Sequence, residues 1–345
     1  MAILVTGAAG FIGSNFLLDW FSQSNEDVIS LDLLTYAGNL ESLESLKQNP
    51  NHYFIRGDIR DYELVLQLLR KYQIRAIINF AAESHVDRSI NKPSAFIETN
   101  IVGTYNLLEA ARAYWSELDE NLKYLFRFLH ISTDEVYGSL GLSDHAFTET
   151  NRYQPNSPYS ASKAASDHLA RAWFCTYGLP VTTLNCSNNF GPYQFPEKLI
   201  PLSILNALNN RHITVYGDGK QIRDWIYVKD TSEAIRNILN KGRKGETYNL
   251  GGCNEKTNLE VVNTICNILD KLKPKSKGSY HDQIAFVKDR PGHDRRYAIN
   301  AEKIKTELGW KPKETFSTGL SKTVLWYLEH QDWVSSVTKS SNDNM

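Results

Sequence analysis

The segment from Ile3 to Gly13 constrains the fold of this chain more than any other part of its sequence. An apolar run, Ile3–Thr6, leads into Gly7-Ala8-Ala9-Gly10-Phe11-Ile12-Gly13, and an amphipathic stretch follows. Glycines at this spacing permit a tight turn and let backbone N–H groups approach a phosphate at a helix N-terminus. A strand, a glycine turn and a helix in this order predict a Rossmann-type, doubly wound parallel sheet.

The rest of the first half repeats the same alternation. We expect strands at Ile3–Thr6, Val28–Leu31, Tyr53–Arg56, Ala76–Phe80 and Phe126–Ser132. Helices are expected between them, at residues 14–21, 62–72 and 95–114. Buried strands that alternate with helices indicate an α/β fold in which helices cover both faces of the sheet. Ligand sites in such sheets lie at the carboxyl ends of the strands.

The glycine loop also predicts the cofactor. Asp32 ends the next predicted strand, at about the separation expected for a carboxylate that holds the adenosine ribose hydroxyls. Leu33 and Leu34 follow it, so no basic residue stands ready there for a 2′-phosphate, and NAD is favoured over NADP. Asp58 follows the third strand and is either within reach of the adenine amino group or a helix cap.

The regular alternation ends near Cys186, where turn-rich segments begin. We therefore predict an NAD-binding domain over residues 1–185, with late returns near 224–251. A smaller α/β substrate-binding lobe is expected at 186–223 and 252–333, closing over the carboxyl edge of the sheet. Residues 334–345 are polar and are predicted to form a frayed tail.

Composition excludes several kinds of partner. The formal net charge is −1, so no global field recruits nucleic acid or an anionic membrane. The four cysteines form no CxxC pair and read as free thiols in a reducing compartment. No apolar run is long enough to span a membrane, and the N-terminus reads as a first strand, not a signal peptide. We expect a soluble, cytoplasmic protein without a bound metal.

Tyr159 and Lys163 form a Tyr-x-x-x-Lys pair, which on a helix places both side chains on one face. A free tyrosine has a pKa of about 10 and is a poor base at neutral pH. A nearby ammonium and a positive nicotinamide would favour the phenolate, which can then accept a proton from a sugar hydroxyl. The pair predicts oxidation of an alcohol by a nicotinamide cofactor, although the same spacing occurs by chance in many helices.

Asp134 and Glu135, in Ser132-Thr133-Asp134-Glu135-Val136-Tyr137-Gly138, add a second chemical step. Next to a new ketone, one carboxylate can remove a proton from carbon while a protonated partner assists departure of a hydroxyl. Two close carboxylates also tend to split their pKa values, as an acid–base pair requires. Neighbours on a regular strand point to opposite faces, so both reach one substrate only if the chain has left the strand here. The alternative is that both carboxylates are solvated residues of a loop after the strand.

These motifs resemble those of the extended short-chain dehydrogenase/reductases, and within that family the nucleotide-sugar 4,6-dehydratases. The resemblance covers nearly the whole chain and includes the segments 34–40, 81–89 and 290–297. Thr133-Asp134-Glu135 is its most specific part, because relatives that do not dehydrate their substrate lack the acid–base pair.

The resemblance implies conversion of dTDP-glucose to its 4-keto-6-deoxy product with NAD as cofactor. Tyr159 would take the C4 hydroxyl proton, with Lys163 tuning it and binding the nicotinamide ribose. Thr133 would hydrogen-bond the C4 oxygen, Glu135 would remove the C5 proton, and Asp134 would protonate the departing C6 hydroxyl. Two helices per subunit, near residues 99–114 and 159–177, would form a homodimer. The product would serve deoxysugar synthesis for a bacterial surface polysaccharide.

The resemblance also implies two sets of binding residues. NAD would contact Gly7, Gly10, Phe11, Ile12, Gly13, Asp32, Asp58, Ile59, Ala81, Ala82, Thr99, Tyr159 and Lys163. The nucleotide sugar would contact Ser84, Asn188, Lys198, Leu199, Tyr216, Arg223, Asn258, Arg290, His293 and Tyr297. Arg295 and Arg296 are expected to be solvated or structural charges.

Other functions remain open at this point. A 4-epimerase would leave the two carboxylates without a role. A dehydratase of a CDP- or UDP-sugar would keep the chemistry and change only the contacts that read the base. A nucleotide-sensing or scaffolding protein on the same fold would be expected to lack the catalytic residues, all of which are present.

Overall fold

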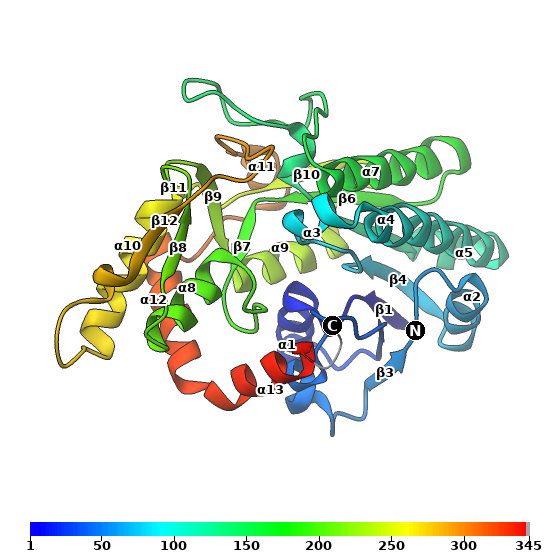
Figure 1. The fold of residues 1–345 in the computed structure, drawn as a ribbon. Coiled ribbons are helices and arrows are strands. Elements are labelled where there is room, and N and C mark those ends of the chain that lie inside the picture. The colour runs from blue at the N-terminus through cyan, green and yellow to red at the C-terminus, as the bar shows by residue number, and fades with distance from the viewer. Residues whose placement is uncertain (343–345) are drawn as a thin grey trace.

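The computed structural model describes residues 1–342, and its larger lobe is built on a seven-stranded parallel sheet (Figure 1). The strand order is β10-β6-β5-β4-β1-β2-β3. The strands are β1 (Ala2–Thr6), β2 (Val28–Asp32), β3 (His52–Arg56), β4 (Ile74–Asn79), β5 (Arg127–Thr133), β6 (Val181–Cys186) and β10 (Thr247–Leu250). The order reverses between β1 and β4, the point at which such sheets bind ligands. The predicted Rossmann-type α/β fold is confirmed.

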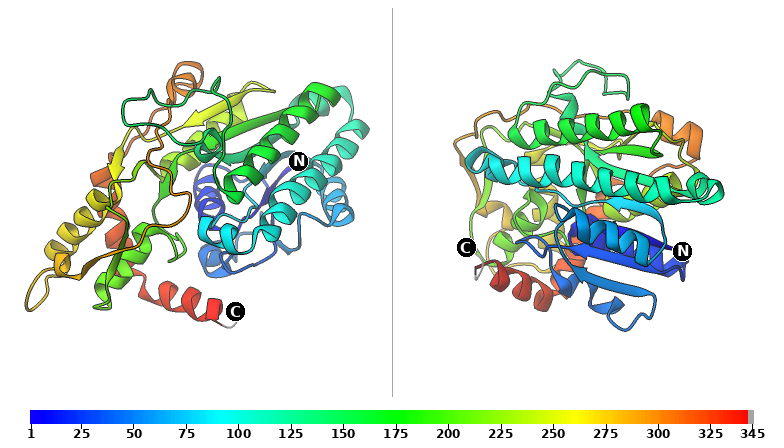
Figure 2. Two further views of the ribbon diagram at one scale, coloured as in Figure 1. Left: turned by 45° about the horizontal axis from the view of Figure 1, so that its top comes forward. Right: turned by 90° about the vertical axis from the view of Figure 1, so that its right-hand side faces the viewer.

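Helices cover both faces of this sheet. They are α1 (Phe11–Gln23), α2 (Tyr62–Lys71), α5 (Thr104–Glu117), α7 (Pro158–Tyr177), α9 (Val228–Lys241) and α11 (Glu302–Leu308). Alternate side chains of β1 explain how: Ile3 and Val5 pack in one cluster with α1 and α9, and Ala2 and Leu4 pack in another with α2, α5 and α7. The second view in Figure 2 shows α5 and α7 running side by side on the outer face.

Short elements complete this lobe: η1 (Leu40–Leu46), α3 (Val86–Asn91), α4 (Pro93–Phe96), η2 (Ile97–Gly103), α6 (Glu120–Leu125) and η3 (Asp134–Tyr137). The single helix predicted over residues 95–114 is therefore three consecutive elements, α4, η2 and α5. The middle one, η2, is π-helical, with wider turns that occur often at functional sites.

Among the described residues, the smaller lobe contains two small sheets, three α-helices and one 3₁₀ helix. One sheet has the order β11-β9-β7 and the other pairs β12 with β8. The elements are β7 (Asn188–Phe190), α8 (Leu199–Leu208), β8 (Ile213–Tyr216), β9 (Ile222–Tyr227), β11 (Glu255–Thr257), α10 (Asn258–Leu272), η4 (Tyr280–Gln283), β12 (Ile284–Val287) and α12 (Phe316–Glu329). Within the segment 224–251, α9 packs on α1 and β10 pairs with β6, whereas β9 belongs to this lobe.

The prediction of a frayed tail from residue 334 is wrong for residues 334–342, which lie in helix α13 (Gln331–Asn342). Trp333, Val334 and Val337 are buried and fall on one face of that helix. The Trp333 indole Nε1 donates to Ser42 Oγ of η1 at 3.2 Å, so α13 reaches from the smaller lobe to the larger one (Figure 2, left). Three apolar side chains with distant partners outweigh the polar composition of the segment. Residues 343–345 lie outside the described part of the chain.

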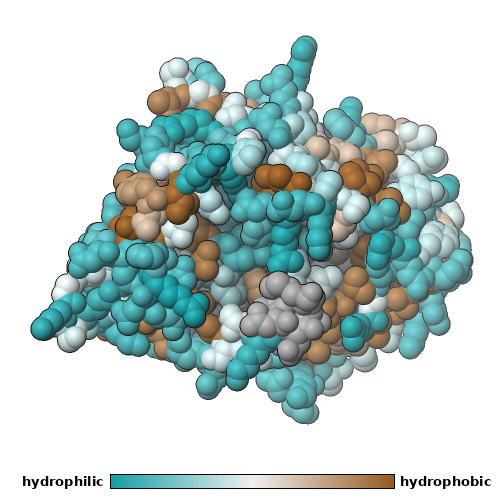
Figure 3. Space-filling model, viewed as in Figure 1, coloured by the Kyte–Doolittle hydropathy of each residue, from teal (hydrophilic) through white to brown (hydrophobic). Residues whose placement is uncertain are grey.

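The face of the molecule in Figure 3 is largely hydrophilic, with hydrophobic residues in small scattered groups. Among the described residues, no helix has both the length and the apolar character needed to cross a membrane.

Candidate active site

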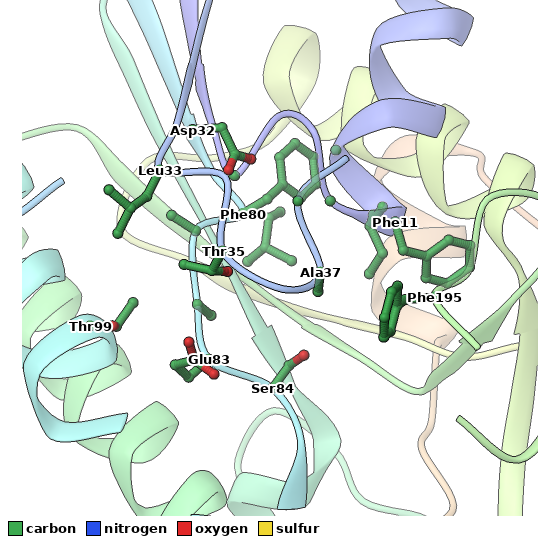
Figure 4. Close-up of a pocket in the computed structure, with 18 of the residues that line it drawn as sticks. Phe11, Asp32, Leu33, Thr35, Ala37, Phe80, Glu83, Ser84, Thr99 and Phe195 are labelled. Atoms are coloured by element: carbon green, nitrogen blue, oxygen red, sulfur yellow. The ribbon is translucent and has the colours of Figure 1, made fainter. Parts of the chain in front are cut away.

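Two adjoining cavities lie at the carboxyl edge of the large sheet, and the first contains the glycine loop. Figure 4 shows its side chains converging from the loop after β1, the end of β2 and the segment after β4. Every residue predicted to contact NAD lines this cavity: Gly7, Gly10, Phe11, Ile12, Gly13, Asp32, Asp58, Ile59, Ala81, Ala82, Thr99, Tyr159 and Lys163.

The glycine loop has room for no side chain at two of its positions. Gly7 has a φ of +65°, and a Cβ there would lie 2.6 Å from the backbone nitrogen of Ala81. A Cβ on Gly13 would lie 2.3 Å from the carbonyl oxygen of Gly7. Gly10 is the N-cap of α1 and offers no side-chain cap, so the first-turn N–H groups of this helix are available to an anion. The loop therefore fits a dinucleotide pyrophosphate.

Asp32 is held rigidly beside that loop. Its Oδ2 accepts from the Ala9 N–H at 2.9 Å and its Oδ1 from the Leu34 N–H at 2.8 Å. Burial raises the pKa of this carboxyl, and the two backbone hydrogen bonds lower it. A fixed carboxylate at the end of β2 suits the ribose hydroxyls of an adenosine.

Asp58 is not the cap of the following helix. Its carboxylate accepts from the Arg60 guanidinium at 2.9 and 2.7 Å, and Asp61 caps α2 by accepting from the Leu64 N–H. Of the two roles that the sequence left open for Asp58, the cap is excluded.

The second cavity adjoins the first, and Tyr159 lines both. Its lining contains every residue predicted to contact the nucleotide sugar: Ser84, Asn188, Lys198, Leu199, Tyr216, Arg223, Asn258, Arg290, His293 and Tyr297. Thr133, Asp134 and Glu135 line it as well. The candidate catalytic residues therefore lie where the two cavities meet.

The chain leaves the strand at the position that the two carboxylates require. Strand β5 ends at Thr133, and the 3₁₀ turn η3 begins at Asp134. The turn is capped by the Thr133 hydroxyl, which accepts from the Glu135 N–H at 3.2 Å. Because neither carboxylate is on a regular strand, both side chains can line one cavity.

The surroundings of the two carboxyl groups differ. Asp134 is 1% exposed, and its Oδ2 has no hydrogen-bond partner among the described residues. Burial first, and then the charge of Glu135, raise its pKa well above the usual range. Burial also raises the pKa of Glu135 above its ordinary value, but the positive charges of Arg223, Lys198 and Arg290 offset part of that rise, whereas Asp134 is raised further. Asp134 is thus suited to be the protonated acid and Glu135 the carboxylate base.

Tyr159 and Lys163 lie in the first turns of α7, which Pro158 and a Ser157–Ser160 capping box begin. The Lys163 ammonium donates to the carbonyl of Ile131 at 2.7 Å, and burial lowers its pKa to about 8. Burial, and then the charge of Glu135, raise the pKa of Tyr159 above its ordinary value, and a hydrogen bond with Thr133 offsets part of that rise. In this structure the neighbour that favours the phenolate is thus Thr133, and Lys163 bonds to the backbone of β5.

Three cations face the second cavity from three segments. Lys198 Nζ donates to the carbonyl of Ser84 at 2.8 Å, and Arg290 Nη1 donates to Asp87 at 2.8 Å. The Arg223 guanidinium lies over the Tyr297 ring at 4.3 Å. Such a group of positive charges suits a diphosphate.

Arg295 and Arg296, which were expected to be solvated or structural charges, both form ion pairs within the protein. Arg295 pairs with Asp218, and Arg296 pairs with Glu255 through two nitrogens.

Several residues that line the cavities were not predicted. Among them are Thr35, Ala37, Gly38, Glu83, His85, Asp87, Gln194, Phe195 and Glu197. The first six fall in the segments 34–40 and 81–89, whose resemblance to the family was a usable signal. The last three lie in an irregular segment before α8 and carry no such signal.

The chain is similar to known proteins over nearly its full length. A family model described as GDP-mannose 4,6 dehydratase matches residues 4–323. A dTDP-glucose 4,6-dehydratase of Xanthomonas campestris pv. campestris is 60% identical over 339 residues, covering 98% of this chain and 96% of that protein. A solved dTDP-glucose 4,6-dehydratase of Bacillus anthracis in complex with NAD is 47% identical, with a TM-score of 0.86 and coverage of 98% and 99%. Another of Streptomyces venezuelae, also with NAD bound, is 44% identical, with a TM-score of 0.89 and coverage of 98% and 100%.

Proposed function

The chain belongs to the GDP-mannose 4,6 dehydratase family, and on that premise we propose that it is an NAD-dependent lyase acting on dTDP-glucose. The reaction converts dTDP-glucose to dTDP-4-keto-6-deoxyglucose and water. The observation that carries this proposal is the position of Asp134 and Glu135, which line one cavity with Tyr159 and have surroundings suited to an acid and a base.

NAD fits the first cavity. The glycine loop and the N-terminus of α1 would hold its pyrophosphate, and Asp32 its adenosine ribose. Lys163 and Tyr159 would lie beside the nicotinamide ribose, where the two cavities adjoin. Bound there, NAD supplies a hydride acceptor for oxidation at C4 and a hydride donor for reduction at C6, so the overall reaction needs no external reductant.

The residues of the second cavity would move the protons. Tyr159 accepts the C4 hydroxyl proton as the C4 alcohol becomes a ketone, and Thr133 hydrogen-bonds the C4 oxygen. The ketone makes the C5 hydrogen acidic, and Glu135 removes it. Asp134 gives its proton to the C6 oxygen as the C6–O bond breaks, and water leaves. Reduction at C6 and return of a proton to C5 complete the product.

Two other functions share part or all of this chemistry. A 4-epimerase would oxidise and reduce C4 without the two carboxylates. A dehydratase of a CDP- or UDP-sugar would differ only in its base-reading contacts. The identity of 60% to a dTDP-glucose 4,6-dehydratase over nearly the whole chain favours the dTDP-sugar.

Mass spectrometry of the nucleotide sugar after incubation with dTDP-glucose, without added reductant, tests this function. A product lighter by one water, with no net reduction of NAD, is expected. A product of unchanged mass that co-migrates with the galactose isomer would identify an epimerase. Unreacted dTDP-glucose, with conversion of the CDP- or UDP-sugar instead, would refute the assigned base.

We further propose that the protein is a homodimer that packs through α5 and α7. These helices run side by side. Exposed apolar residues lie on them and on the elements α3 and η2 that contact them. The residues are Ile90, Ile97, Val102, Tyr105 and Tyr177. Light scattering of the purified protein should give twice the mass of one chain. A Tyr105→Asp variant should then give the mass of a single chain.

We also propose that the enzyme works in the cytoplasm. Its four cysteines are free, as a reducing compartment would keep them.

A 4-keto-6-deoxy sugar is a precursor for deoxysugars such as dTDP-rhamnose, so the product would serve polysaccharide synthesis. Loss of 6-deoxyhexose from the surface polysaccharide of a strain without this gene would support that role.

A further inference from the structure

An ion pair joins the two lobes across the second cavity. Arg290 follows β12 of the smaller lobe, and its Nη1 donates to Oδ1 of Asp87 at 2.8 Å. Asp87 is in the first turn of α3 in the larger lobe, and both residues line the cavity. The two residues are 203 positions apart in the sequence, so this contact exists only because the lobes face each other.

Arg290 is held at both of its ends. At its backbone, the N–H donates to Oδ1 of Asp289 at 2.9 Å, and Asp289 also bonds Gln221 and His293. At its guanidinium end, Nη1 donates a hydrogen bond to Asp87. The side-chain exposures of 26% for Arg290 and 37% for Asp87 leave the pair partly screened from water.

One edge of the guanidinium is left free. Arg290 Nε is buried and has no hydrogen-bond partner among the described residues. A buried donor without a partner is unfavourable, so this nitrogen calls for an acceptor that the described residues do not supply. The edge formed by Nε and Nη2 is one that a phosphate group can engage with two parallel hydrogen bonds.

The charges around this edge favour an anion. Arg290 lies close enough to Lys198 and Arg223 for their positive charges to act on one another, and also acts on Glu135. Asp87 is on the Nη1 side of the guanidinium, so it offsets one positive charge and leaves the free edge for a ligand.

We propose that Asp87 is a positioning residue that holds Arg290 across the cleft with its free edge turned to the diphosphate of the nucleotide sugar. This inference rests on the proposed function, because it takes a nucleoside diphosphate as the ligand. Asp87 does not touch the ligand. It acts by fixing the Arg290 side chain before the ligand binds. Without Asp87, the loss of Arg290 rotamer freedom would be a cost of binding.

Titration calorimetry of dTDP into the NAD-loaded enzyme tests the proposal. Asp87→Ala removes the acceptor for Nη1 and should raise the Kd for dTDP roughly two- to tenfold, the cost of ordering one long side chain. Asp87→Asn keeps an acceptor oxygen and should recover most of the wild-type affinity. A charge effect alone would instead make these two variants alike.

Asp19→Ala is the matched control. Asp19 accepts from Nη1 of Arg236 at 2.6 Å, with similar side-chain exposure, but this pair joins α1 to α9 away from both cavities. The Kd for dTDP should not change in this variant.

A double-mutant cycle with Arg290→Gln completes the test. If Asp87 acts through Arg290, the variant with both Asp87→Ala and Arg290→Gln binds dTDP as Arg290→Gln alone does. Additive losses, or an unchanged or tighter Kd in Asp87→Ala, would overturn the positioning role while leaving the proposed function intact. Failure of the wild-type enzyme to bind dTDP would overturn the proposed function, and this inference with it.

Discussion

Replacing Glu135 by glutamine keeps the size of the side chain and removes the proposed base. Burial raises the pKa of Glu135 above its ordinary value, and the positive charges of Arg223, Lys198 and Arg290 offset part of that rise by favouring the carboxylate. A neutral amide in the same place can still fill the cavity but cannot accept the C5 proton. The residues proposed to act on the C4 alcohol, Tyr159 and Thr133, are unchanged.

The expected loss follows from the size of general base catalysis. A positioned base contributes about 10²–10⁴-fold to the rate, which corresponds to roughly 3–5 kcal/mol of transition-state stabilisation. We expect Glu135→Gln to lower kcat with dTDP-glucose by about this factor. NAD should remain bound, since Glu135 lines only the second cavity.

Hydrogen exchange at C5 gives the sharper readout. In deuterated water the Glu135→Gln variant should incorporate no deuterium at C5 of the nucleotide sugar recovered after incubation. The C4 ketone forms in this variant, but the adjacent C5 is not deprotonated. Asp134→Asn is the matched control: it lacks the acid for the C6 hydroxyl and should slow dehydration while C5 exchange continues. Near-normal turnover or C5 exchange in Glu135→Gln would refute the assignment of the base.

Three further changes have defined outcomes. Gly7→Ala should weaken NAD binding by about 1–3 kcal/mol in titration calorimetry, because its φ of +65° and the backbone of Ala81 leave no room for a Cβ. Trp333→Ala should cost about 3–5 kcal/mol in denaturant unfolding, since this buried side chain ties α13 to η1; an unchanged midpoint would contradict the packing. Asp134→Asn should raise Tm near neutral pH by roughly 2 °C, or about 1 kcal/mol. The native pKa of Asp134 is raised, so the wild type loses stability as the pH rises above 3.8, and melting at pH 4 should show a smaller gain.

The fold and the cofactor cavity could be predicted because their signals are local. The glycine loop and Asp32 lie in one strand–helix–strand unit, and the alternation of apolar runs with amphipathic stretches predicted strands at the positions of β1 to β5. The turn after β5 is also local, since Thr133 caps it through the Glu135 N–H. A threonine before two acidic residues is a helix-start signal that the sequence already contained.

The contacts that could not be predicted join distant parts of the chain. Trp333, directly before the expected frayed tail, packs against η1, and Asp87 pairs with Arg290, and no pattern in either segment indicates these contacts. The partner of Lys163 is a backbone carbonyl of β5, which any residue at that position would provide. Local patterns specify elements, whereas these contacts depend on how elements far apart in the sequence pack against one another.

The central claim is an internal oxidation and reduction with loss of water, and dTDP-glucose labelled with deuterium at C4 tests it most directly. The account predicts that the product is lighter by one water and carries the deuterium at C6, because the hydrogen removed from C4 returns within the same active site. Deuterium retained at C4 of an isomer of unchanged mass, or lost to solvent, would contradict it.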